Sequence, residues 1–179
     1  MSSPASTPEQ TPVPSSVNHD SYDPKWLAET MASVTSVAMV GASTNTTRPS
    51  YFVMKYLLDK GFDVVPINPG AAGGLILGQP VLAALADLPH PVDMVDIFRS
   101  SDAAGGIVDE ALALPVLPKV IWMQFNVRND AAAARAEARG VRVVMNRCPK
   151  VEYARAHGEL GWQGLNSGLI SSKRRKIQK

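Results

Sequence analysis

The chain has 179 residues, of which 45% are hydrophobic and 19% charged, a composition typical of one globular domain with a real core. Its formal net charge is +2, but five of the 18 basic residues lie in the last seven positions, KRRKIQK. The rest of the chain therefore has 13 basic and 16 acidic residues. A nucleic-acid-binding domain carries its positive charge on the folded body, so this distribution disfavours nucleic acid as the partner of the domain.

Several protein classes are excluded or disfavoured by simple counts. A single cysteine, Cys148, rules out an internal disulfide and speaks against a zinc cluster. No apolar run approaches the roughly 18–20 residues that a membrane helix needs. The N-terminal stretch MSSPASTPEQTPVPSS has no Lys or Arg and no apolar segment, unlike a secretory signal or a transit peptide. We therefore expect a cytoplasmic protein with no membrane association, and the basic tail leaves nuclear localisation open.

Three regions follow from the composition along the chain. Residues 1–22 are rich in Ser, Pro and Thr without periodicity, which predicts a disordered tail. Residues 23–164 form the expected folded domain, and residues 165–179 a basic C-terminal tail. Order is expected to begin with a helix that Asp23 caps and Pro24 opens.

Strands and helices then alternate. Strands are predicted at 36–41, 63–68, 91–98, 119–125 and 141–146, and helices at 49–61, 100–114, 129–140 and 148–161. Ser101 or Asp102 is the predicted cap of the helix at 100–114, and the glycine-rich loop 69–81 leaves a sixth, short edge strand open near 77–81. Strands that are apolar on both faces and separated by helices predict an α/β fold: a Rossmann-like, doubly wound parallel sheet with helices on both faces.

In such sheets a ligand binds at the carboxyl ends of the strands. The first of these turns, VGASTNTTRPS, has a single glycine, Gly41, followed by Ala42 and Ser43. Small residues let an anion approach the backbone, and the helix that follows presents free N–H groups. Arg48 and Ser50, at the start of that helix, add a guanidinium and a hydroxyl suited to a phosphate.

The second turn lacks a residue that NAD-binding folds use. Their second strand ends in Asp or Glu, which binds the ribose hydroxyls, whereas this one ends in Asn68-Pro69. An acid would repel a ligand phosphorylated on that ribose, and an amide would tolerate it. Asn-Pro is also ordinary turn chemistry, and both interpretations stay open.

The remaining turns hold few groups for catalysis. Phe98 and Arg99 follow the third strand, and Gln124 and Asn126 follow the fourth. Cys148 follows the last strand and begins a helix: it is either buried and inert or, through the helix terminus, a reactive thiol with a redox role. The sequence holds no metal-ligand spacing, P-loop or nucleophile elbow, so no catalytic residue is predicted.

Taken together, these turns resemble a known family. The segments that carry the resemblance are VAMVGASTNTTRPSYFVMKYL, VVPINPG, PVDMVDIFR, VIWMQFNV, AAARAEARGVRVVMNRCPKVEY and NSGLISSKR, spread over roughly residues 33–173. They are similar to the small stand-alone CoA-binding proteins, whose domain also occurs in the alpha subunit of succinyl-CoA synthetase. The synthetases carry a further domain with a phosphorylated histidine, which we do not expect in this chain.

The resemblance implies a ligand, coenzyme A or an acyl-CoA, and a set of contacts. The implied contacts are Gly41, Ala42, Ser43, Arg48 and Ser50 at the phosphates, Asn68 and Pro69 near the 3′-phosphorylated adenosine, Phe98 and Arg99 flanking the nucleotide, and Met123 and Gln124 toward the pantetheine arm. The expected function is non-catalytic CoA binding, with a partner protein or a homodimer left open. The alternatives are an NAD(P)-dependent oxidoreductase on the same fold and a nucleic-acid-associated regulator that uses the basic tail.

Overall fold

The structure, a computed structural model, describes residues 17–159. Most of the two expected tails, residues 1–16 and 160–179 with the basic KRRKIQK segment, lies outside the described residues. Residues 17–22, assigned to the N-terminal tail from sequence, are described, and Tyr22 is buried there. Its hydroxyl accepts a hydrogen bond from the backbone N–H of Met145 at 2.7 Å, which fastens this segment to the end of the last strand.

Five parallel strands form the central sheet, in the order β2-β1-β5-β6-β7. They are β1 (Ser36–Val40), β2 (Asp63–Ile67), β5 (Met94–Ile97), β6 (Val120–Met123) and β7 (Arg142–Val144). Every residue of β5 and β6 is buried, as expected for strands covered on both faces. The Rossmann-like doubly wound sheet predicted from the sequence is confirmed, and the strand order reverses between β1 and β5.

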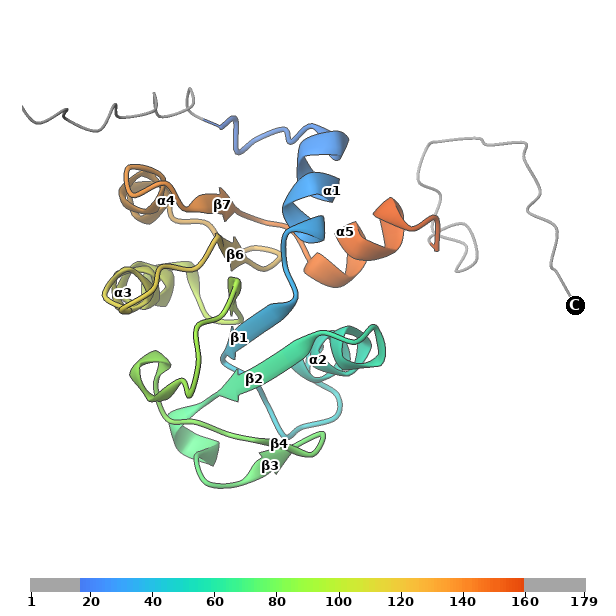
Figure 1. Ribbon diagram of the computed structural model, residues 1–179, viewed down its shortest axis with the longest axis vertical. Coiled ribbons are helices and arrows are strands. Elements are labelled where there is room, and N and C mark those ends of the chain that lie inside the picture. Colours follow the sequence, from blue (N-terminus) through green and yellow to red (C-terminus); the bar gives the residue numbers. More distant parts are fainter. Residues whose placement is uncertain (1–16, 160–179) are drawn as a thin grey trace, which may run out of the picture.

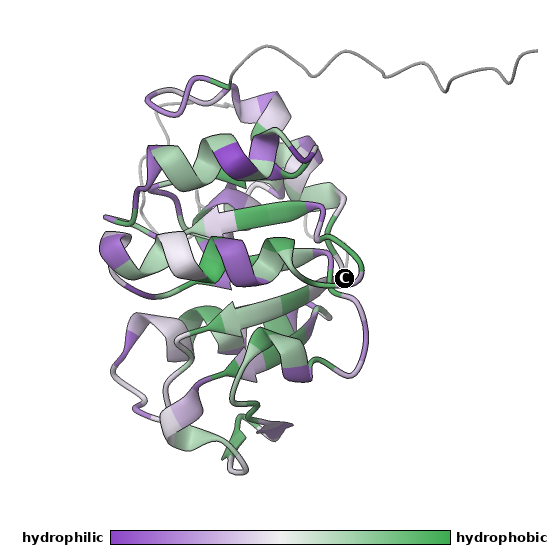
Figure 2. Cartoon of the chain, turned by 90° about the vertical axis from the view of Figure 1, so that its left-hand side faces the viewer, coloured by the Kyte–Doolittle hydropathy of each residue, from purple (hydrophilic) through white to green (hydrophobic). Residues whose placement is uncertain are grey.

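Helices cover both faces of this sheet (Figure 1). The helices α1 (Pro24–Ala32), α2 (Pro49–Asp59) and α5 (Pro149–Ala156) pack on one face, and α3 (Ser101–Leu112) and α4 (Asp130–Glu137) on the other. Each face has its own hydrophobic cluster, because side chains alternate along each strand. Figure 2 shows hydrophobic strands between helices that alternate hydrophobic and hydrophilic residues, the pattern from which the layers were predicted.

The predicted cap of α1, Asp23, is confirmed, and the predicted cap of α3 is not. Asp23 caps α1 by accepting from the N–H of Lys25, and Asn129 caps α4 by accepting from that of Ala132. The predicted cap of α3, Ser101 or Asp102, is wrong: Ser100 is the cap. The Ser101 hydroxyl instead accepts from the N–H of Arg128 at 3.0 Å, a partner distant in sequence.

The glycine-rich loop forms a separate small hairpin. Here β3 (Leu75–Ile76) and β4 (Gln79–Pro80) pair antiparallel between two short 3₁₀ helices, η1 (Pro69–Ala71) and η2 (Leu85–Asp87). A parallel bridge between Ile67 and Leu82 joins this region to the edge of the main sheet. Pro80 has no N–H to donate, which limits how far a strand can extend here.

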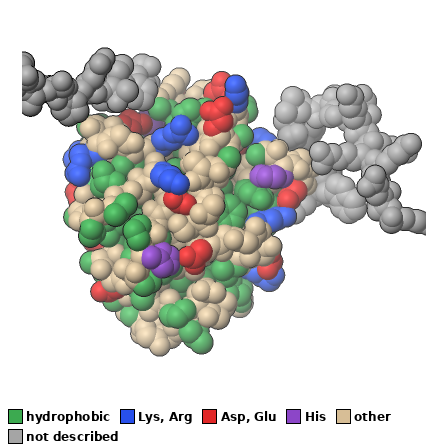
Figure 3. Space-filling model, viewed as in Figure 1, with side chains coloured by type: hydrophobic (Ala, Val, Ile, Leu, Met, Phe, Trp, Pro, Cys, Tyr) green, Lys and Arg blue, Asp and Glu red, His purple; other side chains and the backbone are tan. Residues whose placement is uncertain are grey.

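The surface mixes charges of both signs, as Figure 3 shows for one face of the molecule. An example is the pair formed by Lys119 Nζ and Asp93 Oδ1, 2.8 Å apart. Among the described residues, none of the helices has the length and apolar character needed to cross a membrane.

Candidate functional site

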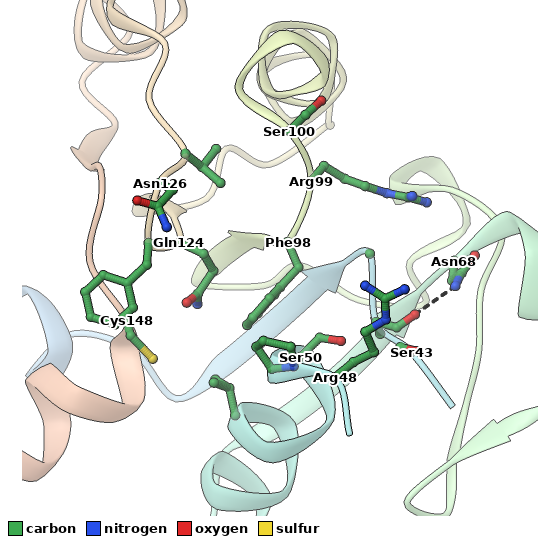
Figure 4. Close-up of a pocket in the computed structure, with 16 residues that line it drawn as sticks. Ser43, Arg48, Ser50, Asn68, Phe98, Arg99, Ser100, Gln124, Asn126 and Cys148 are labelled. Atoms are coloured by element: carbon green, nitrogen blue, oxygen red, sulfur yellow. Dashed lines mark hydrogen bonds between the residues drawn. The ribbon is translucent and has the colours of Figure 1, made fainter. Parts of the chain in front are cut away.

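A cavity of about 680 Å³ opens at the carboxyl ends of the strands, beside the point where the strand order reverses (Figure 4). The turns that follow all five strands contribute to its wall. The lining residues are Gly41, Ala42, Ser43, Arg48, Pro49, Ser50, Val53, Asn68, Phe98, Arg99, Ser100, Gln124, Phe125, Asn126, Val127 and Cys148. This is the position at which open α/β sheets bind their ligands.

Gly41 is required by the backbone at the centre of the site. Its φ is +88°, a left-handed conformation that favours glycine, and its N–H donates to the carbonyl oxygen of Ile67 at 2.9 Å. A Cβ at this position would lie 2.3 Å from the carbonyl oxygen of Phe98. The single glycine of the first turn therefore lets the ends of β1 and β5 approach each other closely.

Asn68 joins the first two turns. Its Nδ2 donates to the carbonyl oxygen of Ala42 at 2.8 Å, and its Oδ1 accepts from the N–H of Gly70 at 2.9 Å. The amide therefore caps η1 and braces the turn after β1, which is the turn chemistry that the sequence left open. A carboxylate here has no N–H with which to donate to Ala42.

One end of the cavity is cationic. Arg48 and Arg99 project into the same region as Asn68 in Figure 4, and neither guanidinium has an ion-pair or hydrogen-bond partner within residues 17–159. Helix α2 begins here, and its N-cap residue, Arg48, makes no side-chain cap. The first-turn N–H groups of such a helix and its dipole favour an anion.

The other end of the cavity is neutral. The thiol of Cys148 and the amide of Gln124 lie there, away from the two arginines (Figure 4). Burial, the main cause, raises the pKa of the Cys148 thiol to about 11, and the nearby Asp96 carboxyl adds to this effect. The helix start therefore does not activate the thiol, and the interpretation of Cys148 as a buried, inert cysteine is favoured over a reactive one.

Behind this neutral end lies a buried acid, Asp96, which was not singled out from the sequence. Asp96 in β5 has no exposed surface, and Gln124 Nε2 donates to its two carboxyl oxygens at 2.8 and 3.1 Å. Burial raises the pKa of Asp96 to about 8, although the hydrogen bond from Gln124 opposes this shift. At neutral pH the protonated form therefore predominates.

Most of the predicted site residues meet in this cavity, and two do not. Pro69 is exposed at the start of η1 and does not line the cavity. Met123 is fully buried on the opposite face of the sheet, in the cluster that packs against α3 and α4. Successive residues of an extended chain point to opposite faces, so Gln124 points away from the cluster that holds Met123.

Six lining residues were not among the predicted contacts: Pro49, Val53, Ser100, Phe125, Asn126 and Val127. Val53 lies one helical turn after Ser50, a spacing that places both on one face of α2 and was readable from the sequence. Asn126 has a φ of +64° and donates its backbone N–H to Asn146 Oδ1 at 2.8 Å, a long-range contact without a local signal.

Groups for acid–base or metal chemistry are scarce around the cavity. Apart from the two arginines, the titratable side chain in its wall is Cys148; His19, His90 and His157 all lie elsewhere. Within residues 17–159, no group of three His, Cys, Asp or Glu side chains is placed to hold a metal ion.

Known proteins share both the sequence pattern and the fold. The uncharacterized Bacillus subtilis protein YneT is 31% identical over 118 residues, which span 66% of this chain and 84% of that protein. A solved structure from Thermus thermophilus is 32% identical, with a TM-score of 0.70, over 75% of this chain and 99% of its own. A hypothetical protein from Pyrococcus horikoshii OT3 is 31% identical, with a TM-score of 0.72, over 80% and 99% of the two chains.

A family model described as a CoA binding domain matches residues 35–154, which include all five strands of the sheet and the turns that line the cavity. The chain therefore belongs to the CoA-binding domain family.

Proposed function

We propose that this chain binds coenzyme A or an acyl-CoA in the cavity at the carboxyl ends of the strands, without catalysing a reaction on it. The observation that carries the proposal is the cationic end of the cavity, where Arg48 and Arg99 flank the uncapped start of α2. A family of CoA-binding domains supplies the ligand class, and CoA carries several phosphates that match this charge.

The phosphates of the ligand would lie against the turn formed by Gly41, Ala42 and Ser43, at the start of α2. Small side chains there allow backbone N–H groups to approach an anion, and Arg48 adds charge-assisted hydrogen bonds. Asn68 leaves the second strand without a carboxylate, so a 3′-phosphate on the ribose meets no acidic side chain at that position.

Binding without catalysis is consistent with the chemistry of the cavity wall. Among the lining residues of the described range 17–159, Cys148 is the titratable side chain other than arginine, and its raised pKa keeps it a neutral thiol. The molecule would act as a carrier or sensor of CoA, or hand the ligand to a partner protein.

The test is a calorimetric titration of CoA, acetyl-CoA, NAD and NADP into the wild type and the variant Arg48→Ala. Loss of a charge-assisted hydrogen bond costs about 1.5–3 kcal/mol, so the variant should bind CoA more weakly by roughly tenfold or more. Arg139→Ala is a matched control, since Arg139 is exposed after α4, at the opposite edge of the sheet. Tight binding of NAD without binding of CoA would refute the proposal. Equal CoA affinity of the wild type and Arg48→Ala would refute it as well.

A further inference from the structure

Asp96 and Gln124 form a buried, hydrogen-bonded polar pair inside an otherwise apolar part of the core. Asp96 lies on the sheet face that α2 and α5 cover, in register with Met39 of β1 and Trp122 of β6. Both neighbours are buried and uncharged, and within residues 17–159 Gln124 is the only hydrogen-bond partner of the Asp96 carboxyl. A buried acid with one partner depends on that partner for every hydrogen bond it makes.

Gln124 is also part of the cavity wall. Its side chain is 6% exposed and lines the neutral end, while its Nε2 points back to Asp96. In this orientation the amide oxygen, Oε1, is the atom left for a ligand, and none of the described residues donates a hydrogen bond to it. Whatever sets the orientation of this amide therefore sets whether the cavity offers an acceptor or a donor.

The protonation state of Asp96 determines which orientation is satisfied. An ionised carboxylate only accepts, so it requires the Gln124 NH₂ group to face it. A protonated carboxyl has an O–H that must donate, and Gln124 Oε1 can accept from it after the amide rotates by about 180°. The NH₂ group then turns to the cavity.

We propose that Asp96 and Gln124 form a proton-dependent selector for a carbonyl oxygen of the ligand, with Gln124 presenting its NH₂ group when Asp96 is protonated and its oxygen when Asp96 is ionised. The inference rests on the proposed function, because the carbonyl would belong to a CoA-type ligand: either a pantetheine amide or an acyl thioester. Asp96 is fully buried and does not touch the ligand, so it is a positioning residue for Gln124.

The surroundings leave Asp96 as the group that titrates near neutral pH at this end. The Cys148 thiol, at the N-cap of α5, has a pKa raised to about 11, and within α5 the buried Glu152 is paired with Arg155. From α2 the cavity-lining side chains Ser50 and Val53 are uncharged. Arg48 and Arg99 lie at the other end of the cavity. Since the pKa of Asp96 is about 8, the donor form predominates at pH 7 and the acceptor form above pH 9.

The experiment measures the affinity of the full chain for acetyl-CoA by calorimetry between pH 7 and pH 9.5. Acetyl-CoA has no free thiol, and its phosphates titrate at about pH 6, below this window. The wild-type affinity should fall by roughly three- to tenfold as the pH rises through about 8, the magnitude of one neutral hydrogen bond. A parallel series with S-ethyl-CoA, which lacks the thioester carbonyl, identifies the carbonyl. If the affinity falls with both ligands, the carbonyl that Gln124 binds belongs to a pantetheine amide. If it falls with acetyl-CoA alone, the carbonyl belongs to the thioester.

Two variants test whether the pH dependence of the affinity comes from Asp96 and Gln124 or from another titrating group. Asp96→Asn has the same shape and does not titrate, so its affinity should be constant across the window. Gln124→Leu should bind acetyl-CoA more weakly at pH 7 and also show no fall, and it keeps the test valid should the Asp96 variant not fold. A flat wild-type profile, or a fall that persists in either folded variant, overturns the selector while CoA binding itself stands. Absence of acetyl-CoA and CoA binding at pH 7 refutes the proposed function as well.

Discussion

The substitution Gly41→Ala tests how the first turn builds the cavity. The residue has a φ of +88°, where an L side chain costs roughly 1–2 kcal/mol. The added Cβ would also lie 2.3 Å from the carbonyl oxygen of Phe98 and 3.0 Å from its carbon, both of them backbone atoms. A clash with backbone cannot be relieved by a change of rotamer, so the ends of β1 and β5 must move apart.

The magnitude combines these two effects. The Phe98 N–H donates to the carbonyl oxygen of Val40 at 2.8 Å, so moving Phe98 strains the hydrogen bonds between β1 and β5. Forcing an extra carbon into a packed site costs about 1–3 kcal/mol. With the conformational strain, the free energy of unfolding should fall by about 2–5 kcal/mol, which for a domain of this size lowers the Tm by roughly 5–15 °C.

A second glycine provides a matched control. Gly61, after α2, also has a φ of +88°, but a Cβ there would meet nothing within 4 Å. Gly61→Ala therefore carries the conformational strain alone, about 1–2 kcal/mol. Urea and thermal unfolding of both variants measure the difference, and CoA titration of the folded variants should show weakened binding only for Gly41→Ala. Equal destabilisation of the two would refute the argument that close approach of Phe98 dictates glycine at position 41.

Three further outcomes follow from the site. Because burial raises the pKa of Cys148 to about 11, iodoacetamide at pH 7.5 should label the native protein far more slowly than the urea-unfolded chain; equal rates would show an accessible thiolate. The pKa of Asp96 is raised from 3.8 to about 8, so the native state binds the extra proton and the free energy of unfolding should fall as the pH rises from about 4 to about 8. Urea titrations at pH 5 and pH 8 should show no such fall for Asp96→Asn, and the same fall in this variant would contradict the raised pKa of Asp96. Asn68→Ala removes the bonds to Ala42 and Gly70 and should cost about 1–3 kcal/mol in unfolding free energy, whereas no loss would mean that water replaces the amide.

Local patterns in the sequence were sufficient for the fold. Five apolar segments separated by helices predicted the parallel sheet, and the cap Asp23 lies where short-range chemistry places it. These features depend on residues within a few positions of one another, so they can be read from the chain. The carboxyl-edge rule likewise predicted that Gly41 and Arg48 would meet in one cavity with residues far along the chain.

Contacts between distant segments decided the rest. The cap of α3 is Ser100, whereas the Ser101 hydroxyl accepts a hydrogen bond from the N–H of Arg128 in the turn after β6. The Met123 side chain points into the core under α3 and α4, whereas the Gln124 side chain lines the cavity. Burial raised the pKa of Cys148, against the effect expected of a helix start, and kept Asp96 largely protonated at neutral pH. Desolvation and long-range hydrogen bonds depend on what folds against a residue, and that is a property of the packed molecule rather than of any short stretch of its sequence.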